Sequence, residues 1–279
     1  MANITAQQVN NLRARTGVGL MDCKKALVET NGDEDAAIEL LRKKGAATQI
    51  KRADKESNEG IVAVHLSDDG KTAAIAEVNT ETDFVAKTDN FKAFAATVVR
   101  RVFDSGENST ASLAEELSTI VAQTGENVKI SRSARFIRDG YGILASYVHN
   151  GGKIGVLVEF ATSAEPPPAL AAFSRQVAMH IAAAAPRYLT RDDVPADIIA
   201  KEREIAIALS VGKPEAAVNK LVLGKIEKYF GETCLLDQKF VIDNSGKTIS
   251  ELLAGQATQA GQTVSITRFK RFQVGVPPE

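Results

Sequence analysis

An internal repeat constrains the fold of this 279-residue chain more than any other feature of its sequence. When the sequence is shifted by 82 residues, so that Gly60 falls on Gly142, nine of the forty residues in 60–99 are identical to those in 142–181. Self-similarity at a fixed spacing indicates two copies of one structural unit. The chain is therefore expected to contain two related halves.

Each copy has the pattern of an antiparallel strand hairpin followed by a helix. In the first copy, apolar stretches at 61–66 and 72–78 flank a Ser-Asp-Asp-Gly turn, which predicts two paired strands. The second copy predicts a hairpin at 142–160 and, after three prolines, a helix at about 169–185. The helix of the first copy is predicted from apolar residues that recur at intervals of three and four: Phe91, Phe94, Ala95, Val98, Val99 and Val102.

Further signals complete the first half. Asp89 is expected to cap the helix after the hairpin, and a Ser-x-x-Glu capping box at Ser112 and Glu115 predicts a second helix that ends at Gly125. The segment 128–136 then predicts a third strand.

The N-terminal region predicts three short helices in about 45 residues. Thr5 begins a Thr-x-x-Gln capping box before the first helix. Asp22 and Asp33 are expected to cap the second and third helices, and Gly45 is expected to end the third. These helices predict a small bundle.

A different pattern follows residue 186. Two helical stretches of roughly 15 residues flank Gly212-Lys213-Pro214 and predict an antiparallel helical hairpin. Such a hairpin has little core of its own, so its apolar stripe is expected to pack against a second copy of the chain or against the body. Strands at 239–243 and 264–272, with a helix at 249–254 between them, are expected to complete the second half.

These patterns predict an α+β fold with an inserted helical hairpin. The predicted parts are a three-helix N-terminal module (1–55) and a first core subdomain (56–140). A second core subdomain is discontinuous (141–186 and 232–279), and the hairpin (187–231) is inserted in it.

Composition and charge exclude several classes of protein. The formal net charge is −1 with basic residues spread along the chain, which predicts neither a nucleic-acid-binding nor a membrane-binding surface. Two cysteines give no disulfide framework and fit a reducing compartment. No apolar run is long enough for a membrane span, and the first residues resemble no targeting signal. We therefore expect a cytoplasmic protein.

No enzyme signature is complete in this sequence. Ser245-Gly246-Lys247-Thr248 imitates the end of a phosphate-binding loop, but the glycine required five residues before Gly246 is replaced by Val241. A turn in which Thr248 caps a helix is the favoured interpretation.

The three histidines, His65, His149 and His180, match no zinc-binding or nucleophilic pattern. His180 is expected in the core, His65 is expected to be solvated on a strand, and His149 is expected to be exposed in a hairpin turn. We expect no catalytic residue, no metal site and no cofactor.

The two copies diverge at Thr82-Asp83-Phe84-Val85. The second copy has Ala164-Glu165-Pro166-Pro167 at the equivalent positions, so the scaffold itself requires no aromatic residue there. In one interpretation Asp83 caps a helical turn and Phe84 packs against the body. In the other, Phe84 is an exposed wedge with a carboxylate beside it, and aromatic anchors are frequent hot spots of protein interfaces.

Five segments match, in order, the motifs of a known family. Residues 17–27 (Gly-Val-Gly-Leu-Met-Asp-Cys-Lys-Lys-Ala-Leu) and 77–87 (Glu-Val-Asn-Thr-Glu-Thr-Asp-Phe-Val-Ala-Lys) look like its N-terminal and central signatures. The segments 125–128, 152–158 and 179–183 also match. Over essentially its whole length, the chain resembles the bacterial translation elongation factor Ts family.

This resemblance implies a fold and an activity. The implied fold has an N-terminal module similar to ubiquitin-associated domains, a core of two α+β subdomains and a helical hairpin that can serve dimerisation. The implied activity is guanine-nucleotide exchange on elongation factor Tu: the family binds the GTPase carrying GDP, loosens the nucleotide and its magnesium, and leaves when GTP rebinds. No covalent chemistry is implied.

The resemblance also implies which residues contact the partner. Leu20 and Ile242 differ from the family pattern by exchanging one apolar residue for another, which should keep the contact. The sequence ends without the helical extension of some members, so no contact from such an extension is expected. Contacts with the switch region of the GTPase correspond to Thr82, Asp83, Phe84 and Val85. Contacts with its nucleotide domain correspond to Arg13, Leu20 and Met21. Contacts with its far domain correspond to His149, Val241 and Ile242.

Two other classes of function remain as alternatives. An enzyme could use the segment Gly246-Lys247-Thr248 for a nucleotide, and direct nucleotide binding by the isolated chain would support it. An RNA-binding protein could use the scattered basic clusters, and its binding would weaken steeply with salt.

Overall fold

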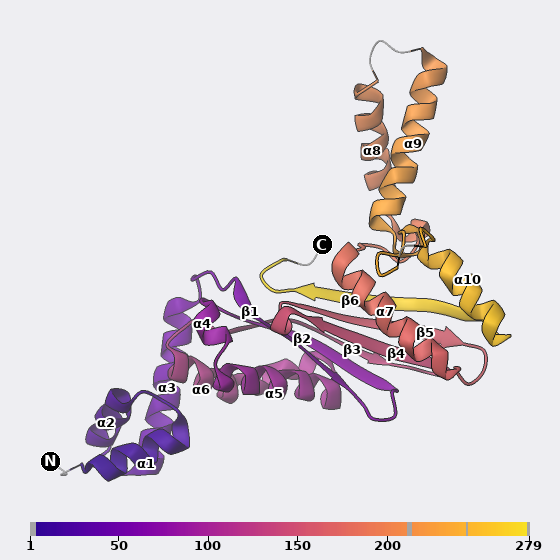
Figure 1. Ribbon diagram of the computed structural model, residues 1–279. Coiled ribbons are helices and arrows are strands. Elements are labelled where there is room, and N and C mark those ends of the chain that lie inside the picture. Colours follow the sequence, from indigo (N-terminus) through magenta and orange to yellow (C-terminus); the bar gives the residue numbers. More distant parts are fainter. Residues whose placement is uncertain (1–3, 211–213, 244, 278–279) are drawn as a thin grey trace.

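The computed structural model describes residues 4–210, 214–243 and 245–277. Within them, helices cover two three-stranded antiparallel sheets, so the protein has the α+β fold that the sequence predicts (Figure 1). No helix in these ranges is long and apolar enough to cross a bilayer.

The first sheet contains the predicted hairpin, and its strands lie in the order β1-β2-β3. All six apolar residues of the predicted helical face are buried against it. The elements of this half are β1 (Glu59–Leu66), β2 (Thr72–Thr80), α4 (Asp83–Ala86), α5 (Asp89–Ser105), the 3-10 helix η1 (Glu107–Leu113), α6 (Ala114–Thr124) and β3 (Lys129–Ile137).

The second sheet has the same order of strands, β4-β5-β6, and α7 packs against it. Its elements are β4 (Gly142–His149), the 3-10 helix η2 (Asn150–Gly152), β5 (Ile154–Thr162), α7 (Pro168–Ala184), α10 (Ile249–Ala260) and β6 (Val264–Gln273).

The repeat extends to backbone detail. Gly60 and Gly142 have φ of +148° and +152°, and a Cβ at these positions would lie 2.1 Å and 2.0 Å from the carbonyl oxygens of Val78 and Phe160. Only glycine allows this approach of the two strands. Each central strand also has a β-bulge directly before that carbonyl residue. The two halves are therefore structural copies.

The two sheets face each other. Along each strand alternate side chains point to opposite faces, so one face of each sheet meets its helices and the other meets the second sheet. The core between the sheets draws on all six strands and consists of Val62, Ala73, Ile75, Ala134, Phe136, Leu144, Leu157 and Phe272.

An exchange of arginines joins the two halves around this core. Arg132 of β3 lies over the ring of Phe272 in β6, with 4.5 Å from the guanidinium carbon to the ring centroid. Arg268 of β6 lies over Phe136 of β3 in the same way, at 4.3 Å. The halves are thus related by an approximate two-fold arrangement.

Each of these arginines also neutralises a buried carboxylate of the central strand beside it. Arg132 Nε lies 2.7 Å from Glu77, and Arg268 Nε lies 2.5 Å from Glu159. Both glutamates are buried, and a buried carboxylate is costly without a paired cation. The repeated glutamate therefore serves the junction between the sheets.

The three predicted N-terminal helices are α1 (Ala6–Thr16), α2 (Leu20–Glu29) and α3 (Glu34–Arg52). Thr5 and Asp33 cap α1 and α3 as predicted. The prediction for Asp22 is wrong, because α2 begins after Gly19 and Asp22 lies within its first turn.

Gly45 does not end α3. The helix continues to Arg52 and packs along α6, where a Cβ on Gly45 would lie 2.2 Å from the carbonyl oxygen of Ser118. The glycine permits close packing of the two helices. In the sequence, a glycine placed for packing cannot be told from a glycine that ends a helix.

The region after α7 forms two helices that protrude together from the body, α8 (Ala196–Ala208) and α9 (Glu215–Thr233) (Figure 1). Gly212 and Lys213 of the predicted break lie outside the described residues. The predicted strand at 239–243 is wrong: this segment has only an isolated bridge from Lys239 to Thr248. Short 3-10 helices η3 (Arg191–Asp193) and η4 (Leu235–Asp237) border the hairpin.

Two other predicted helix starts differ from the structure. Thr88, not Asp89, caps α5, and its hydroxyl accepts from the backbone nitrogen of Phe91 at 3.3 Å. The capping box at Ser112 does not form, because its hydroxyl instead donates to the Ser109 carbonyl. In both places a neighbouring residue supplied a competing local hydrogen bond.

Candidate partner-binding surface

Phe84 lies at the tip of α4, a single helical turn between β2 and α5. Its side chain is 80% exposed. Thr82, not Asp83, caps the turn, and its hydroxyl accepts from the Val85 backbone nitrogen at 3.4 Å. The interpretation in which Phe84 packs against the body is therefore wrong, and the exposed aromatic residue is the arrangement observed.

Asp83 stands beside Phe84 as a charged group. Its carboxylate accepts from Lys87 Nζ at 2.5 Å, one helical turn further on. This contact lowers the pKa of Asp83 and raises that of Lys87. The tip thus presents an apolar ring next to an ion pair that is open to solvent.

Glu126 holds the start of the turn. Its carboxylate accepts from the Thr82 backbone nitrogen at 3.0 Å and from the hydroxyls of Thr82 and Thr80 at 2.7 Å each. Hydrogen bonds to a charged acceptor are stronger than those between neutral groups. Three such bonds fix the connector where it leaves β2.

Glu81 attaches the same connector to the N-terminal module. Its two oxygens accept from Arg52 at 2.7 Å and 2.6 Å, and one also accepts from the Asn127 backbone nitrogen at 2.7 Å. The bonds from Arg52, with that from Asn127, lower the pKa of Glu81 to about 2. The carboxylate therefore stays ionised, and the last turn of α3 is tied to the connector.

Asn127 completes this attachment. It is buried, and its side-chain amide donates to the carbonyls of Ala53 and Lys55 at 3.4 Å and 2.9 Å. We name the set Glu81, Glu126 and Asn127 the connector clamp. It joins the wedge, the end of α3 and the start of β3.

The predicted contacts of the N-terminal module are all exposed. Arg13 lies on α1, and Leu20 and Met21 open α2 with exposed fractions of 43% and 61%. Their neighbours Leu12 and Cys23 are buried in the core of the module. The apolar pair is thus open to solvent.

The module is fixed to the first half of the core. Gln123 of α6 donates from Nε2 to the Thr16 carbonyl at 2.5 Å, and the Ser118 hydroxyl donates to the Arg42 carbonyl at 2.6 Å. Together with the clamp, these contacts hold α1–α3 and α4 in one arrangement at the same end of the molecule (Figure 1).

The third predicted group lies in the second half. His149 is exposed at the end of β4, as predicted, and Tyr147 hydroxyl lies 3.0 Å from its Nδ1. Val241 is exposed and Ile242 is half-buried against the core of the second sheet. The three residues of this group thus belong to the second half, whereas Phe84 belongs to the first.

His180 supports the segment that carries Val241. It is buried as predicted, its Nε2 lies 2.9 Å from Gln238 Oε1, and its Nδ1 accepts from the Val241 backbone nitrogen at 3.3 Å. Burial lowers the pKa of His180, which keeps the ring neutral and Nδ1 free to accept.

His65 differs from its expected place. It is half-buried on β1, its ring meets Phe103 edge-on at 4.5 Å, and Arg100 lies 2.6 Å from its Nε2. Helix α5 covers this end of the strand, a contact that strand alternation alone does not reveal.

The imitation of a phosphate-binding loop is a helix start. Thr248 and Glu251 form a capping box at α10. Among the described residues, no cluster of His, Cys, Asp or Glu has the arrangement of a metal site.

Comparison with known proteins gives the family. A family model described as "Elongation factor TS" matches residues 81–276, which begin at the connector clamp. The chain belongs to the elongation factor Ts family. It is 44% identical to elongation factor Ts of Nautilia profundicola over 99% of this chain and 94% of that protein. It is 45% identical to elongation factor Ts of Clostridium perfringens over 98% of this chain and 93% of that protein. It is 42% identical to elongation factor Ts of Prosthecochloris aestuarii over 99% of this chain and 100% of that protein.

Membership in the elongation factor Ts family makes the chain a nucleotide exchange factor for elongation factor Tu in translation elongation.

The connector clamp is the part that sequence reasoning missed. Its residues fall within matched motifs, 77–87 and 125–128, but they are 45 positions apart from Glu81 to Glu126, and nothing local showed that they meet.

Proposed function

We propose that this protein binds elongation factor Tu carrying GDP, uses Phe84 as a wedge that releases GDP and magnesium, and leaves when GTP rebinds. The observation that carries the proposal is the exposed Phe84 on a turn held by the clamp. An aromatic side chain on a fixed support loses little conformational entropy on binding. The protein would act by binding alone, without covalent chemistry.

Release of the nucleotide requires coupling between two binding events. A factor weakens GDP binding only by preferring the state of the GTPase that holds GDP poorly, and GDP must then weaken the hold of the factor equally. We propose that Phe84, flanked by Thr82, Asp83 and Val85, enters between the switch-region elements of the GTPase and displaces them. The bound magnesium and phosphates lose their ligands in that state.

The other two groups would supply affinity. Arg13, Leu20 and Met21 are proposed to contact the nucleotide domain, in a three-helix module of the ubiquitin-associated type. The second half would hold the far domain through the exposed His149 of β4 and, in the segment before α10, the exposed Val241 and the half-buried Ile242. The boundaries 1–55, 56–140, 141–186 with 232–279, and 187–231 are proposed as the domains.

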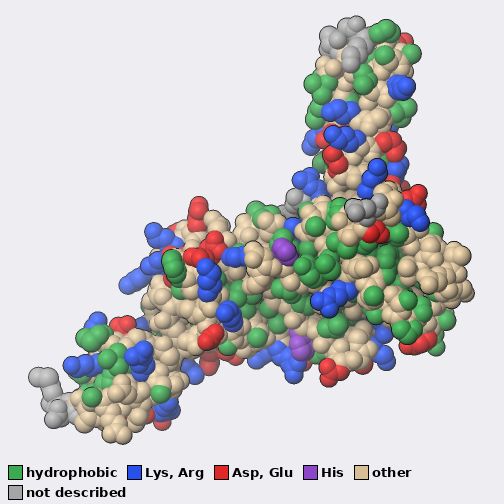
Figure 2. Space-filling model, in the orientation of Figure 1, with side chains coloured by type: hydrophobic (Ala, Val, Ile, Leu, Met, Phe, Trp, Pro, Cys, Tyr) green, Lys and Arg blue, Asp and Glu red, His purple; other side chains and the backbone are tan. Residues whose placement is uncertain are grey.

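We also propose that the α8–α9 hairpin joins two copies of the chain. Ile205, Ile207, Leu209, Leu221 and Leu223 are exposed along it, and hydrophobic side chains are visible along the protrusion (Figure 2). Sedimentation of the free protein tests this assembly.

The wedge is tested by the rate at which labelled GDP leaves the cognate elongation factor Tu. Phe84→Ala should lower the acceleration by about thirtyfold, because removal of an aromatic anchor costs about 2 kcal/mol. The clamp does not involve the ring, so the fold should persist. Stopped-flow fluorescence with wild type and variant measures the effect.

Tyr141→Ala is the matched control, since Tyr141 is also an exposed aromatic residue but lies outside the three contact groups. It should accelerate release like wild type. A Phe84→Ala variant that releases GDP at the wild-type rate would remove the wedge from the mechanism.

A further inference from the structure

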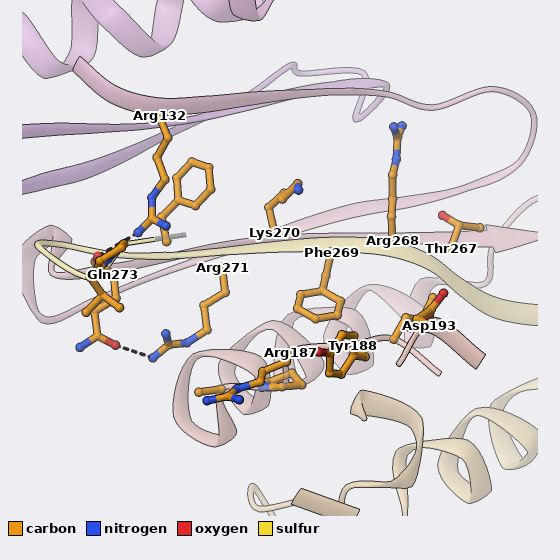
Figure 3. A pocket seen from close by; sticks show the side chains of 16 residues that line it. Arg132, Arg187, Tyr188, Asp193, Thr267, Arg268, Phe269, Lys270, Arg271 and Gln273 are labelled. Atoms are coloured by element: carbon orange, nitrogen blue, oxygen red, sulfur yellow. Dashed lines mark hydrogen bonds between the residues drawn. The ribbon is translucent and has the colours of Figure 1, made fainter. Parts of the chain in front are cut away.

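A basic hollow along β6 is a junction between the two halves of the core. Its volume is about 460 Å³, and each arginine that lines it already has a partner within the protein. Arg132 of the first half, for example, donates to the Gln273 carbonyl of the second at 3.0 Å (Figure 3). The end of β6 is thereby held against the first half.

Two glycines close to this junction lie against the start of β1. A Cβ on Gly152 would lie 2.8 Å from Ile61 Cγ2, and one on Gly275 would lie 2.4 Å from the Asn58 carbonyl oxygen. Their φ angles of +99° and +74° also favour glycine. The start of β1 is therefore packed closely on the second half.

Lys153, directly after Gly152, joins the same strand through its charge. Its Nζ donates to the carboxylate of Glu59, the first residue of β1. Its backbone nitrogen donates to the His149 carbonyl at 3.1 Å, and its own carbonyl accepts from the Val274 nitrogen at 3.0 Å. The lysine thus connects the loop of His149 with β1 from a backbone that is held on both sides.

Glu59 stands where the connector of the wedge begins. It pairs across the sheet with Thr80, the last residue of β2, whose hydroxyl donates to Glu126 of the connector clamp at 2.7 Å. Helix α4 packs against β1, and Val85 of α4 and Ile61 of β1 contact the same core (Figure 1). The support of the wedge therefore includes the strand that Lys153 holds.

The charges of this contact also act on the ion pair beside Phe84. The bond from Lys87 is the main cause of the lowered pKa of Asp83, and the charge of Lys153 lowers it further. The charge of Glu59 adds to the raised pKa of Lys87, after the bond to Asp83. The two ion pairs thus form one group of charges of alternating sign.

We propose, on the basis of the function proposed for Phe84, that Lys153 is a positioning residue for the wedge and acts through Glu59 and the start of β1. The connector clamp holds the turn from the first half and the N-terminal module, whereas Lys153 holds it from the second half. Because the backbone of Lys153 is bonded to His149, one short loop connects the proposed contact with the far domain to the wedge.

Lys153→Met and Glu59→Gln each remove the charge contact with little change in size. Either variant should slow GDP release from elongation factor Tu by about threefold at a saturating concentration of this protein, because partly exposed ion pairs are weak. Stopped-flow fluorescence with labelled GDP measures the rate. Lys201→Met is the matched control: it removes an exposed ion pair with Asp197 on α8 and should release GDP at the wild-type rate.

A double-mutant cycle with Phe84→Ala identifies the route of the effect. If Lys153 places the ring, Lys153→Met should cause no further slowing once the ring is absent, since mutations that act through one contact are not additive. A further threefold slowing in the Phe84→Ala background would indicate that Lys153 contacts the GTPase directly, and would overturn the proposal.

The single variants separate this role from the wedge itself. Wild-type release by Lys153→Met and Glu59→Gln, beside slow release by Phe84→Ala, would refute the positioning role and leave the wedge intact. Wild-type release by Phe84→Ala would refute both. Circular dichroism checks the fold of each variant, and Glu59→Gln, alone and with Phe84→Ala, decides the result if Lys153→Met fails to fold.

Discussion

At the scale of single residues, Phe84 and the connector clamp have different roles. The ring is exposed and is proposed to make the contact, whereas Glu81, Glu126 and Asn127 hold the connector that carries it. Both matched family motifs are needed, because one carries the turn and the other carries two of the three clamp residues. Loss of a clamp residue should therefore impair exchange without removing any contact atom.

Glu126 gives the sharpest test of this role. Glu126→Ala leaves the donors of Thr80 and Thr82 without their acceptor, and each lost bond costs about 1 kcal/mol. We expect GDP release to slow by about tenfold, since a loosened turn places Phe84 less well. The rate of GDP release at a saturating concentration of this protein reports the placement of the wedge. The rate at a limiting concentration also reports its affinity for the GTPase.

Glu126→Gln is the conservative control, because its amide oxygen still accepts from Thr82. It should recover most of the rate. A purely structural role predicts a lower melting temperature with normal exchange below it. That outcome for Glu126→Ala would contradict a positioning role.

At the scale of elements, the docking of α3 on α6 shows how packing overrides local propensity. Glycine weakens an isolated helix, yet α3 runs through Gly45. A glycine is required at this position because the close approach to Ser118 leaves no room for a side chain. The same contact fixes the N-terminal module to the first half of the core. Leu20 and Met21 thereby hold a constant relation to the wedge.

Gly45→Ala tests this packing. Its Cβ would overlap a backbone oxygen, so the folded state should lose about 1–3 kcal/mol despite the better helix propensity of alanine. Chemical denaturation measures the change in the free energy of unfolding.

Gly224 offers the matched comparison within α9. A Cβ there meets nothing within 4 Å, so Gly224→Ala should stabilise the protein by about 0.5–1 kcal/mol. Opposite signs for the two substitutions are expected. A stabilising Gly45→Ala would show that α3 and α6 separate easily.

At the scale of the whole molecule, the duplicated core is a frame with three attachments. The reciprocal arginine contacts join two copies of one sheet unit, and the N-terminal module, the wedge and the hairpin are additions to that frame. Figure 1 shows the module and the hairpin projecting from opposite ends. The frame thus separates the N-terminal module, which is proposed to contact the GTPase, from the hairpin proposed for assembly.

The proposed assembly is tested on the exposed stripe of the hairpin. Leu223→Asp should convert a dimer to a monomer in sedimentation velocity, because it places a charge in an apolar interface. Ile50→Asp, which replaces an even more exposed apolar residue on α3, should leave the dimer intact. A wild-type chain that sediments as a monomer would refute the assembly.

Much of the fold could be predicted from the sequence because its signals are local. The 82-residue repeat, the apolar periodicity of α5 and the turn residues predicted both sheet hairpins and their helices. The errors at Asp89 and Ser112 share one cause, because a competing local hydrogen bond, of Thr88 in one case and of Ser112 with Ser109 in the other, decides the helix start. The error at Asp22 is different, because α2 begins after Gly19 without any side-chain cap.

What the sequence alone determined about this protein is the duplicated α+β frame, the odd aromatic residue at position 84 and the family motifs, since spacing and residue type suffice for these. Tertiary structure decided the rest. It exposed Phe84, brought Glu81, Glu126 and Asn127 together around the connector, continued α3 through Gly45 and left a basic hollow along β6. Each of these depends on contacts between residues far apart in the chain, which local pattern does not encode.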